Sequence, residues 1–309
     1  MITKIFRDFF YACPPNGKQP IVFSFCRLSF RHLTSVLFFI FYFSFSPAGA
    51  QKQLVILHTN DTHSCIMPMK AALADTMLAG RGGYLRRINM LKEERRKNPG
   101  LLLFDSGDFS QGSSYYTMFM GDTEVGLMNL MGYDAATIGN HEFDFGLDNM
   151  ARIFRMANFP IVCANYDFTG TELADIVKPY IILKRQGLKI GVFGICPPLK
   201  GMVSQKNYEP ARFLDPVDVA QQMADMLRNQ KKCDLVICLS HLGWETTEYP
   251  DNYMIEHTRG IDLVLGGHSH TYMKELMYVN NLDGKPVPND QNGKHGVYIG
   301  RLVLSFNKR

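Results

Sequence analysis

The sequence predicts an α/β protein in which helices flank layered β-sheets. From residue 54 onward, short apolar runs rich in β-branched residues alternate with amphipathic stretches, which is the pattern of layered α/β domains. Several of these runs end in polar residues at the same relative place. The 309 residues, 46% of them hydrophobic and 20% charged, are enough to bury a full core. We expect one large domain, alone or with a small appendage.

The elements follow one another in a regular order. The run LVILHTND at 54–61 predicts a strand that leads into a polar loop, and apolar side chains at helical spacing then predict a helix over 82–98. Further strands are expected at 101–108, 135–144, 161–166, 235–243, 261–270 and 296–307. Further helices are expected at 147–157 and 217–227. The segment 180–196 predicts a hairpin around Gln186-Gly187, and the turn-rich stretch 283–288 predicts a connection.

Residues 1–50 predict an export segment. The apolar run VLFFIFYFSF at 36–45 follows Arg27 and Arg31 and precedes SPAGA, an order that matches a secretory signal peptide with cleavage after Ala50. The alternative is a membrane anchor, but the apolar run is shorter than the roughly 20 residues that a spanning helix needs. We therefore expect a periplasmic or secreted protein without a stable membrane span, with the mature chain over 51–309.

Charge and cysteine content narrow the class of protein further. The formal net charge of +4 belongs to the export segment, so the mature chain is electrically balanced and does not indicate binding to a nucleic-acid polymer. Five cysteines follow residue 50, and three of them lie in apolar runs, which favours buried thiols over a disulfide framework. A pairing of Cys233 with Cys238 remains an alternative.

Potential metal ligands stand at the ends of five predicted strands. In chain order they are Asp61 and His63, then Asp108, then Asn140 and His141, then His241, and finally His268 and His270. Ligand sites of α/β sheets gather at the carboxyl ends of the strands, so these five ends are expected to converge. Residues two apart in an extended segment point to the same side, which lets Asp61 with His63, and His268 with His270, face one place. Such nitrogen and oxygen donors suit Zn, Mn, Fe or similar ions.

Five sequence blocks carry a specific resemblance. HTNDTH, SGD followed by Gln111-Gly112, GNHEFD, SHLG and GGHSH occur in that order and resemble the calcineurin-like metallophosphoesterases, more narrowly the secreted bacterial 5′-nucleotidases. The resemblance extends over about 54–309. It implies a catalytic domain built as a layered sandwich of two mixed β-sheets flanked by helices, with a two-metal site at the carboxyl ends of the strands.

The resemblance also implies a role for each polar residue of these blocks. One divalent ion, Zn, Mn or similar, would be held by Asp61, His63, Asp108 and His270. A second ion would be held by Asp108, Asn140, His241 and His268, with Asp108 bridging the two. His141 would contact the phosphate and stabilise the leaving group, and Asp144 would orient His141.

Some residues near these blocks have simpler interpretations. Asp144 directly precedes a predicted helix and is also a candidate for its cap. Glu142 is predicted to be structural, and His58 to be a core histidine or one that orients a ligand residue. His257 and His295 have no motif around them and are predicted to lie at the surface.

The function implied by the resemblance is exported, metal-dependent hydrolysis of phosphate esters. Nucleoside 5′-monophosphates or related nucleotides are the expected substrates. Family members of this type carry a C-terminal domain whose aromatic residues and arginines bind the nucleotide, and we expect that domain to be absent, with the catalytic domain over 51–309. The alternative is an incomplete metal-binding subunit that needs a separate C-terminal-domain protein for substrate binding and activity.

Overall fold

The computed structural model of the chain describes residues 2–12 and 52–307. The apolar run at 36–45 and the predicted cleavage position after Ala50 lie outside the described residues.

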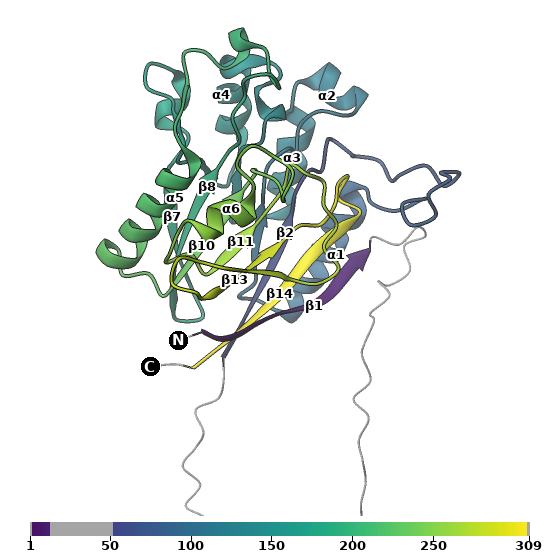
Figure 1. Cartoon of the computed structure of the whole chain (residues 1–309). Coiled ribbons are helices and arrows are strands. Elements are labelled where there is room, and N and C mark those ends of the chain that lie inside the picture. The colour runs from purple at the N-terminus through teal and green to yellow at the C-terminus, as the bar shows by residue number, and fades with distance from the viewer. Residues whose placement is uncertain (1, 13–51, 308–309) are drawn as a thin grey trace, which may run out of the picture.

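Two mixed β-sheets of six strands each form the centre of the molecule (Figure 1). The first has the order β1-β14-β2-β3-β4-β5 and the second β12-β13-β11-β10-β8-β7. The first sheet consists of β1 (Ile2–Ala12), β2 (Lys52–Thr59), β3 (Leu102–Asp105), β4 (Ala135–Thr137), β5 (Ile161–Val162) and β14 (Tyr298–Phe306). The second consists of β7 (Tyr180–Arg185), β8 (Leu188–Ile195), β10 (Leu235–Ser240), β11 (Leu263–Leu265), β12 (Met277–Asn280) and β13 (Pro286–Asp290). A separate pair is formed by β6 (Tyr166–Asp167) and β9 (Arg212–Phe213).

Helices cover the outer faces of both sheets. Figure 1 shows α1 on one outer side of the pair of sheets and α5 on the opposite side. The α-helices are α1 (Tyr84–Lys97), α2 (Ser114–Phe119), α3 (Asp122–Met131), α4 (Gly146–Met156), α5 (Pro216–Asp225) and α6 (Asp251–Glu256). Shorter helical turns are η1 (His141–Phe143), η2 (Glu172–Asp175), η3 (Gln205–Asn207) and the π-helical η4 (Met226–Gln230). Within the described ranges, none of the helices combines the length and the apolar character that crossing a bilayer requires.

The core is divided into layers by the alternation of side chains along each strand. In β2, Leu54 and Ile56 pack between the two sheets, whereas Val55 and Leu57 pack under the outer helices. Because successive side chains of a strand point to opposite faces, a strand buried on both faces is apolar throughout. These features confirm the predicted layered sandwich of two mixed sheets flanked by helices.

The expected turn-rich connection at 283–288 is confirmed only in part, because residues 281–285 form a turn whereas Pro286–Asp290 form strand β13. Strand β12 pairs antiparallel with β13, and β13 pairs in parallel with β11. Strand β13 was not predicted from the sequence because it contains Pro286 and Pro288, and proline lacks the N–H that a central strand donates. The ladder with β11 involves only Asn289 and Asp290, so both prolines lie before it.

Strand β1 was not expected from the sequence, which predicts residues 1–50 as an export segment. It pairs antiparallel with β14 from Ile2 to Ala12. Arg7 lies 2.5 Å from the Asp290 carboxylate, and both side chains are almost fully buried. The same carboxylate lies 2.9 Å from Nε2 of His58, which is in the core as predicted.

The five cysteines in the described part of the chain are free thiols. Cys163, Cys196, Cys233 and Cys238 are buried, and Cys65 is half-buried. The expected buried thiols are therefore observed at four of the five positions, and Cys233 does not pair with Cys238.

Candidate metal centre

Five loops bring the predicted metal ligands together. Loops after β2, β3 and β4, which are neighbours in the first sheet, carry Asp61 with His63, Asp108 and Asn140. Loops after β10 and β11, which are neighbours in the second sheet, carry His241 and the pair His268 and His270. The centre therefore lies where the carboxyl ends of both sets of parallel strands meet, as expected for an α/β fold.

Asp61, His63 and His270 form a first group of donors. Their ligand atoms lie within 4.8 Å of one another. The Nε2 atoms of His63 and His270 are 2.9 Å apart, and Nε2 of His270 is 3.4 Å from Oδ1 of Asp61. Two imidazole nitrogens and a carboxylate oxygen at such separations are a donor set that suits Zn or Mn.

Asp108, His241 and His268 form a second group, again with ligand atoms within 4.8 Å of one another. Nε2 of His241 lies 3.1 Å from Oδ2 of Asp108. On its other side, the His241 ring donates its Nδ1–H to the Ser106 carbonyl at 2.6 Å. This bond determines the orientation of the His241 ring and directs its Nε2 atom toward the expected metal site.

Buried polar atoms without hydrogen-bond partners support the fit of metal ions to these residues. In the described part of the chain they include Nδ1 of His63, Oδ1 of Asn140 and Nδ1 of His268. Nearly all buried polar atoms of proteins are hydrogen-bonded, because an unpaired one costs free energy. Three of the seven predicted ligands are thus left with a donor atom that a cation would satisfy.

Opposite charges dominate the electrostatics of the second group. Burial disfavours the charged forms of both residues, but the attraction between Asp108 and His241 outweighs it. The pKa of His241 is raised to about 10 and that of Asp108 is lowered. Burial, followed by the charge of His241, lowers the pKa of His268 to about 4. His268 is therefore neutral at pH 7, which is the form of imidazole that binds metals.

The backbone of the centre adopts an uncommon conformation. Five ligand residues have positive φ angles, namely Asp61 (48°), His63 (42°), Asp108 (54°), His268 (72°) and His270 (55°). Side chains other than glycine adopt this region rarely, at a cost of about 1–3 kcal/mol each. Bonds between the loops hold it in place: Asp61 N–H donates to the Gly107 carbonyl at 2.9 Å, and His63 N–H donates to the Asp108 carbonyl at 3.0 Å.

Glu142 connects two of the ligand loops. Its buried carboxylate accepts backbone N–H groups from Asp108 at 3.0 Å, Ser110 at 3.0 Å and Gly139 at 2.6 Å. Burial, followed by the charge of Asp108, raises the pKa of Glu142 to about 7. Glu142 therefore has the structural role predicted for it, because its carboxylate joins the loop after β3 to the loop after β4.

His141 and Asp144 form a hydrogen-bonded pair beside the two groups. Nδ1 of His141 lies 3.0 Å from Oδ2 of Asp144, and each side chain is 30% exposed. Burial opposes charge on the ring, but the bond to Asp144 and the charge of Asp108 raise the pKa of His141. The alternative role of Asp144 as a helix cap is wrong, because α4 has Phe145 at its N-cap position and no side-chain cap.

His295 was predicted to lie at the surface and instead reaches the centre. It is half-buried, and its ring centroid is 6.1 Å from that of His63. The backbone N–H of His295 donates to the Asp61 carbonyl at 2.7 Å. Burial, followed by the charge of His63, lowers its pKa to about 4. The sequence contains one local indication of this loop, namely the two glycines at 293 and 296 that flank His295. Both have positive φ angles. His257 is exposed, as expected.

A glycine next to the centre provides a test of its packing. A Cβ at Gly139 would lie 2.2 Å from Oδ1 of Asp108, whereas a Cβ at Gly126 in α3 would have no atom within 4 Å. We expect Gly139→Ala to weaken binding of Mn²⁺ by at least about tenfold, because the methyl group displaces the Asp108 carboxylate. Titration calorimetry with Mn²⁺ measures this, with Gly126→Ala as the matched control. Equal affinities for the two variants would show that Asp108 is not held as described.

Comparison with known proteins places this geometry in a family. Residues 54–272 match the model of the calcineurin-like phosphoesterases. The chain is 31% identical over 282 residues to the human 5′-nucleotidase, an alignment that covers 85% of this chain and 48% of the human protein. The chain therefore spans about half the length of that relative.

Solved structures agree with the sequence comparison. A 5′-nucleotidase precursor from Thermus thermophilus superposes with a TM-score of 0.75 at 28% identity, over 83% of this chain and 52% of the other. The calcineurin-like phosphoesterase YfkN from Bacillus subtilis superposes with a TM-score of 0.67 at 28% identity, over 84% and 86% of the two chains.

Proposed function

Because this chain belongs to the calcineurin-like phosphoesterases, we propose that it hydrolyses phosphate esters with the help of two divalent metal ions. Nucleoside 5′-monophosphates or related nucleotides are the proposed substrates, which the names of the similar proteins support. The observation that carries the proposal is the convergence of two groups of donors, one around Asp61 and one around His241, with ligand atoms within 4.8 Å of one another in each group.

The proposed ligand sets follow these groups. Asp61, His63, Asp108 and His270 would hold one ion, and Asp108, Asn140, His241 and His268 the other. When bound, two such ions lower the pKa of a coordinated water toward about 7 and neutralise charge on the attacking and leaving oxygens. Asp108 is the proposed shared ligand. This role is supported by the backbone N–H of His141, which donates to Oδ1 of Asp108 at 2.9 Å, and by the ring of His241, which lies near Oδ2.

His141 is the proposed proton donor to the departing alkoxide. The bond to Asp144 supports this role, because a ring that donates from Nδ1 to a carboxylate has its orientation restricted and keeps Nε2 for the substrate. The raised pKa of His141 also favours the protonated ring. Asp144 would thus be a positioning residue.

A second candidate function is an incomplete subunit that binds metal and needs a separate protein for substrate binding and activity. The discriminating experiment loads the purified protein with Mn²⁺ or Zn²⁺ and assays AMP and an aryl phosphodiester. Turnover by the protein alone supports hydrolysis. Uptake of two ions without turnover supports the dependent subunit, and failure to bind metal contradicts both proposals.

Export is the proposed location, and it makes a prediction about the mature N-terminus. We expect the protein recovered outside the cytoplasm to begin at Gln51, because the small residues of SPAGA suit cleavage after Ala50. Intact-mass spectrometry of the recovered protein measures this directly. A mass that still includes residues 2–12 would contradict cleavage after Ala50.

A further inference from the structure

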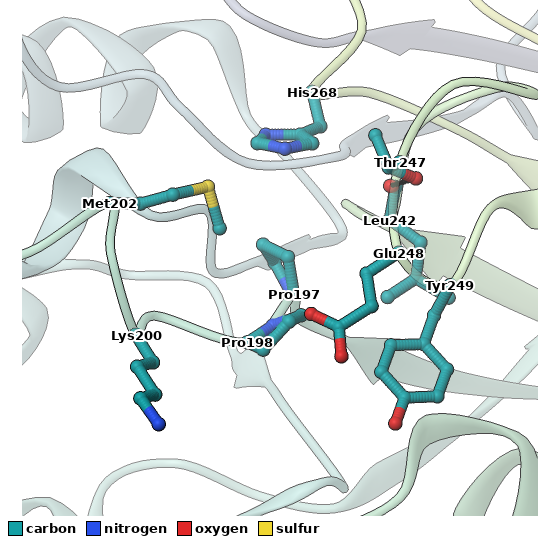
Figure 2. Close-up of a pocket in the computed structure, with 9 residues that line it drawn as sticks. All are labelled: Pro197, Pro198, Lys200, Met202, Leu242, Thr247, Glu248, Tyr249 and His268. Carbon is teal, nitrogen blue, oxygen red and sulfur yellow. Dashed lines mark hydrogen bonds between the residues drawn. The ribbon is translucent and has the colours of Figure 1, made fainter.

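A pocket of about 210 Å³ adjoins the metal centre at His268 (Figure 2). Its walls come from the ends of three neighbouring strands of the second sheet. Pro197 and Pro198 follow β8, the loop with Glu248 and Tyr249 follows β10, and His268 follows β11. Because His268 belongs to both the donor cluster and the pocket wall, a group attached to a phosphate at the centre has this space beside it.

The walls of the pocket are held in place before any ligand arrives. Tyr166 O–H donates to the Pro197 carbonyl at 2.9 Å. The ring of Phe213 packs between Tyr166 and Tyr249, at centroid distances of 5.5 and 6.1 Å. On the other side, the backbone N–H of Trp244 donates to Oγ of Ser269 at 3.0 Å, which connects the loop after β10 to the loop of His268. Such a pre-formed site loses little conformational freedom on binding.

The lining combines apolar faces with one carboxylate and one ammonium group. Pro197, Pro198, Met202 and Tyr249 supply the apolar faces. Figure 2 shows the Glu248 carboxylate directed toward Pro198, whereas the Lys200 ammonium points away from His268. In the described part of the chain neither Glu248 nor Lys200 forms an ion pair, so the carboxylate is available to accept hydrogen bonds from a ligand.

We propose that this pocket binds the sugar ring of the leaving alcohol, the ring joined to the phosphate that is hydrolysed. The inference rests on the proposed function, which puts that phosphate at the metal centre. A volume of about 210 Å³ is below the roughly 300–1,000 Å³ of pockets that enclose a drug-sized ligand, so it suits a single ring. Tyr249 and the prolines would contact the C–H face of the sugar. The Glu248 carboxylate would accept hydrogen bonds from the vicinal hydroxyl groups of the sugar. The negative charge of the carboxylate strengthens these bonds.

The pocket makes Glu248 a specificity-determining residue with a selective effect. We expect Glu248→Gln to lower kcat/KM by about tenfold for AMP and ribose 5-phosphate, since a bond to a charged acceptor has this order of strength. The same change should leave 2′,3′-dideoxy-AMP and p-nitrophenyl phosphate unaffected, because neither presents the vicinal hydroxyls. Glu245→Gln is the matched control, as Glu245 is an exposed carboxylate of the same loop outside the pocket lining.

The outcomes separate this inference from the proposed function. An equal effect of Glu248→Gln on all four esters, or no effect on any, would overturn the sugar pocket while leaving hydrolysis intact. If the wild-type protein hydrolyses none of them, the proposed function fails, and the pocket is then tested by calorimetric titration with adenosine. Binding that is weakened in Glu248→Gln and retained in Glu245→Gln supports the pocket, and absence of binding to the wild-type protein overturns it.

Discussion

Replacing Asp108 with alanine is expected to remove hydrolytic activity and at least one of two bound metal ions. Asp108 belongs to the group with His241 and His268, and also to a group with His63 and His141 in which ligand atoms again lie within 4.8 Å of one another. Losing a shared carboxylate removes several kcal/mol of charge stabilisation, which corresponds to a rate decrease of more than about 10³-fold. Turnover of AMP and metal content by mass spectrometry measure the two effects.

A control is needed because Asp108 is buried and its removal also affects the fold. Asp283→Ala removes a carboxylate that is 54% exposed and pairs with Arg259 at the surface, and it should retain both ions and full activity. Circular dichroism checks that Asp108→Ala remains folded. A folded Asp108→Ala protein that binds two ions and hydrolyses AMP at the wild-type rate would refute the shared ligand.

Replacing His141 with alanine is expected to slow hydrolysis of AMP by about 10²- to 10⁴-fold without loss of metal, because a positioned proton donor contributes this much. The effect should depend on the leaving group. Loss of activity toward p-nitrophenyl phosphate should be much smaller, since p-nitrophenolate departs without a proton. Asp144→Asn should show the same dependence with a smaller decrease, because Asp144 acts through the ring at 3.0 Å.

The leaving-group comparison distinguishes proton donation from general damage to the site. His257→Ala serves as the control, because His257 is exposed and its ring packs on Tyr253. Equal losses of activity of His141→Ala on both esters would count against a proton donor and in favour of a role in phosphate binding alone.

Local pattern was sufficient to predict the parts of the fold that depend on local chemistry. Asp61, Asp108 and His241, which are proposed ligands, lie within three residues of the end of an apolar strand, so they were recognisable from their neighbours in sequence. The helix expected at 147–157 corresponds to α4, and its apolar side chains at helical spacing, Met150, Ile153 and Phe154, are buried.

Contacts between distant segments could not be predicted in this way. His295 contacts Asp61, which lies more than 200 positions earlier in the sequence, and no periodic pattern of residues predicts such a contact. The choice between a cap and a partner of His141 for Asp144 depended on the start of α4, and boundaries are what sequence patterns define least well. Strand β13 was missed because Pro286 and Pro288 disfavour a strand unless the neighbouring ladder begins after them.

The positive φ angles at the proposed metal ligands have a consequence for how this site changes under mutation. At Asp61 and His63, backbone hydrogen bonds that do not involve the side chains hold the loop in its left-handed conformation. Most replacements therefore lose a donor and retain the backbone strain, whereas glycine loses the donor and relieves the strain. Descendants of this protein that have lost catalysis and still fold should accordingly carry glycine at these positions, and their loops should retain the outline of the proposed metal site.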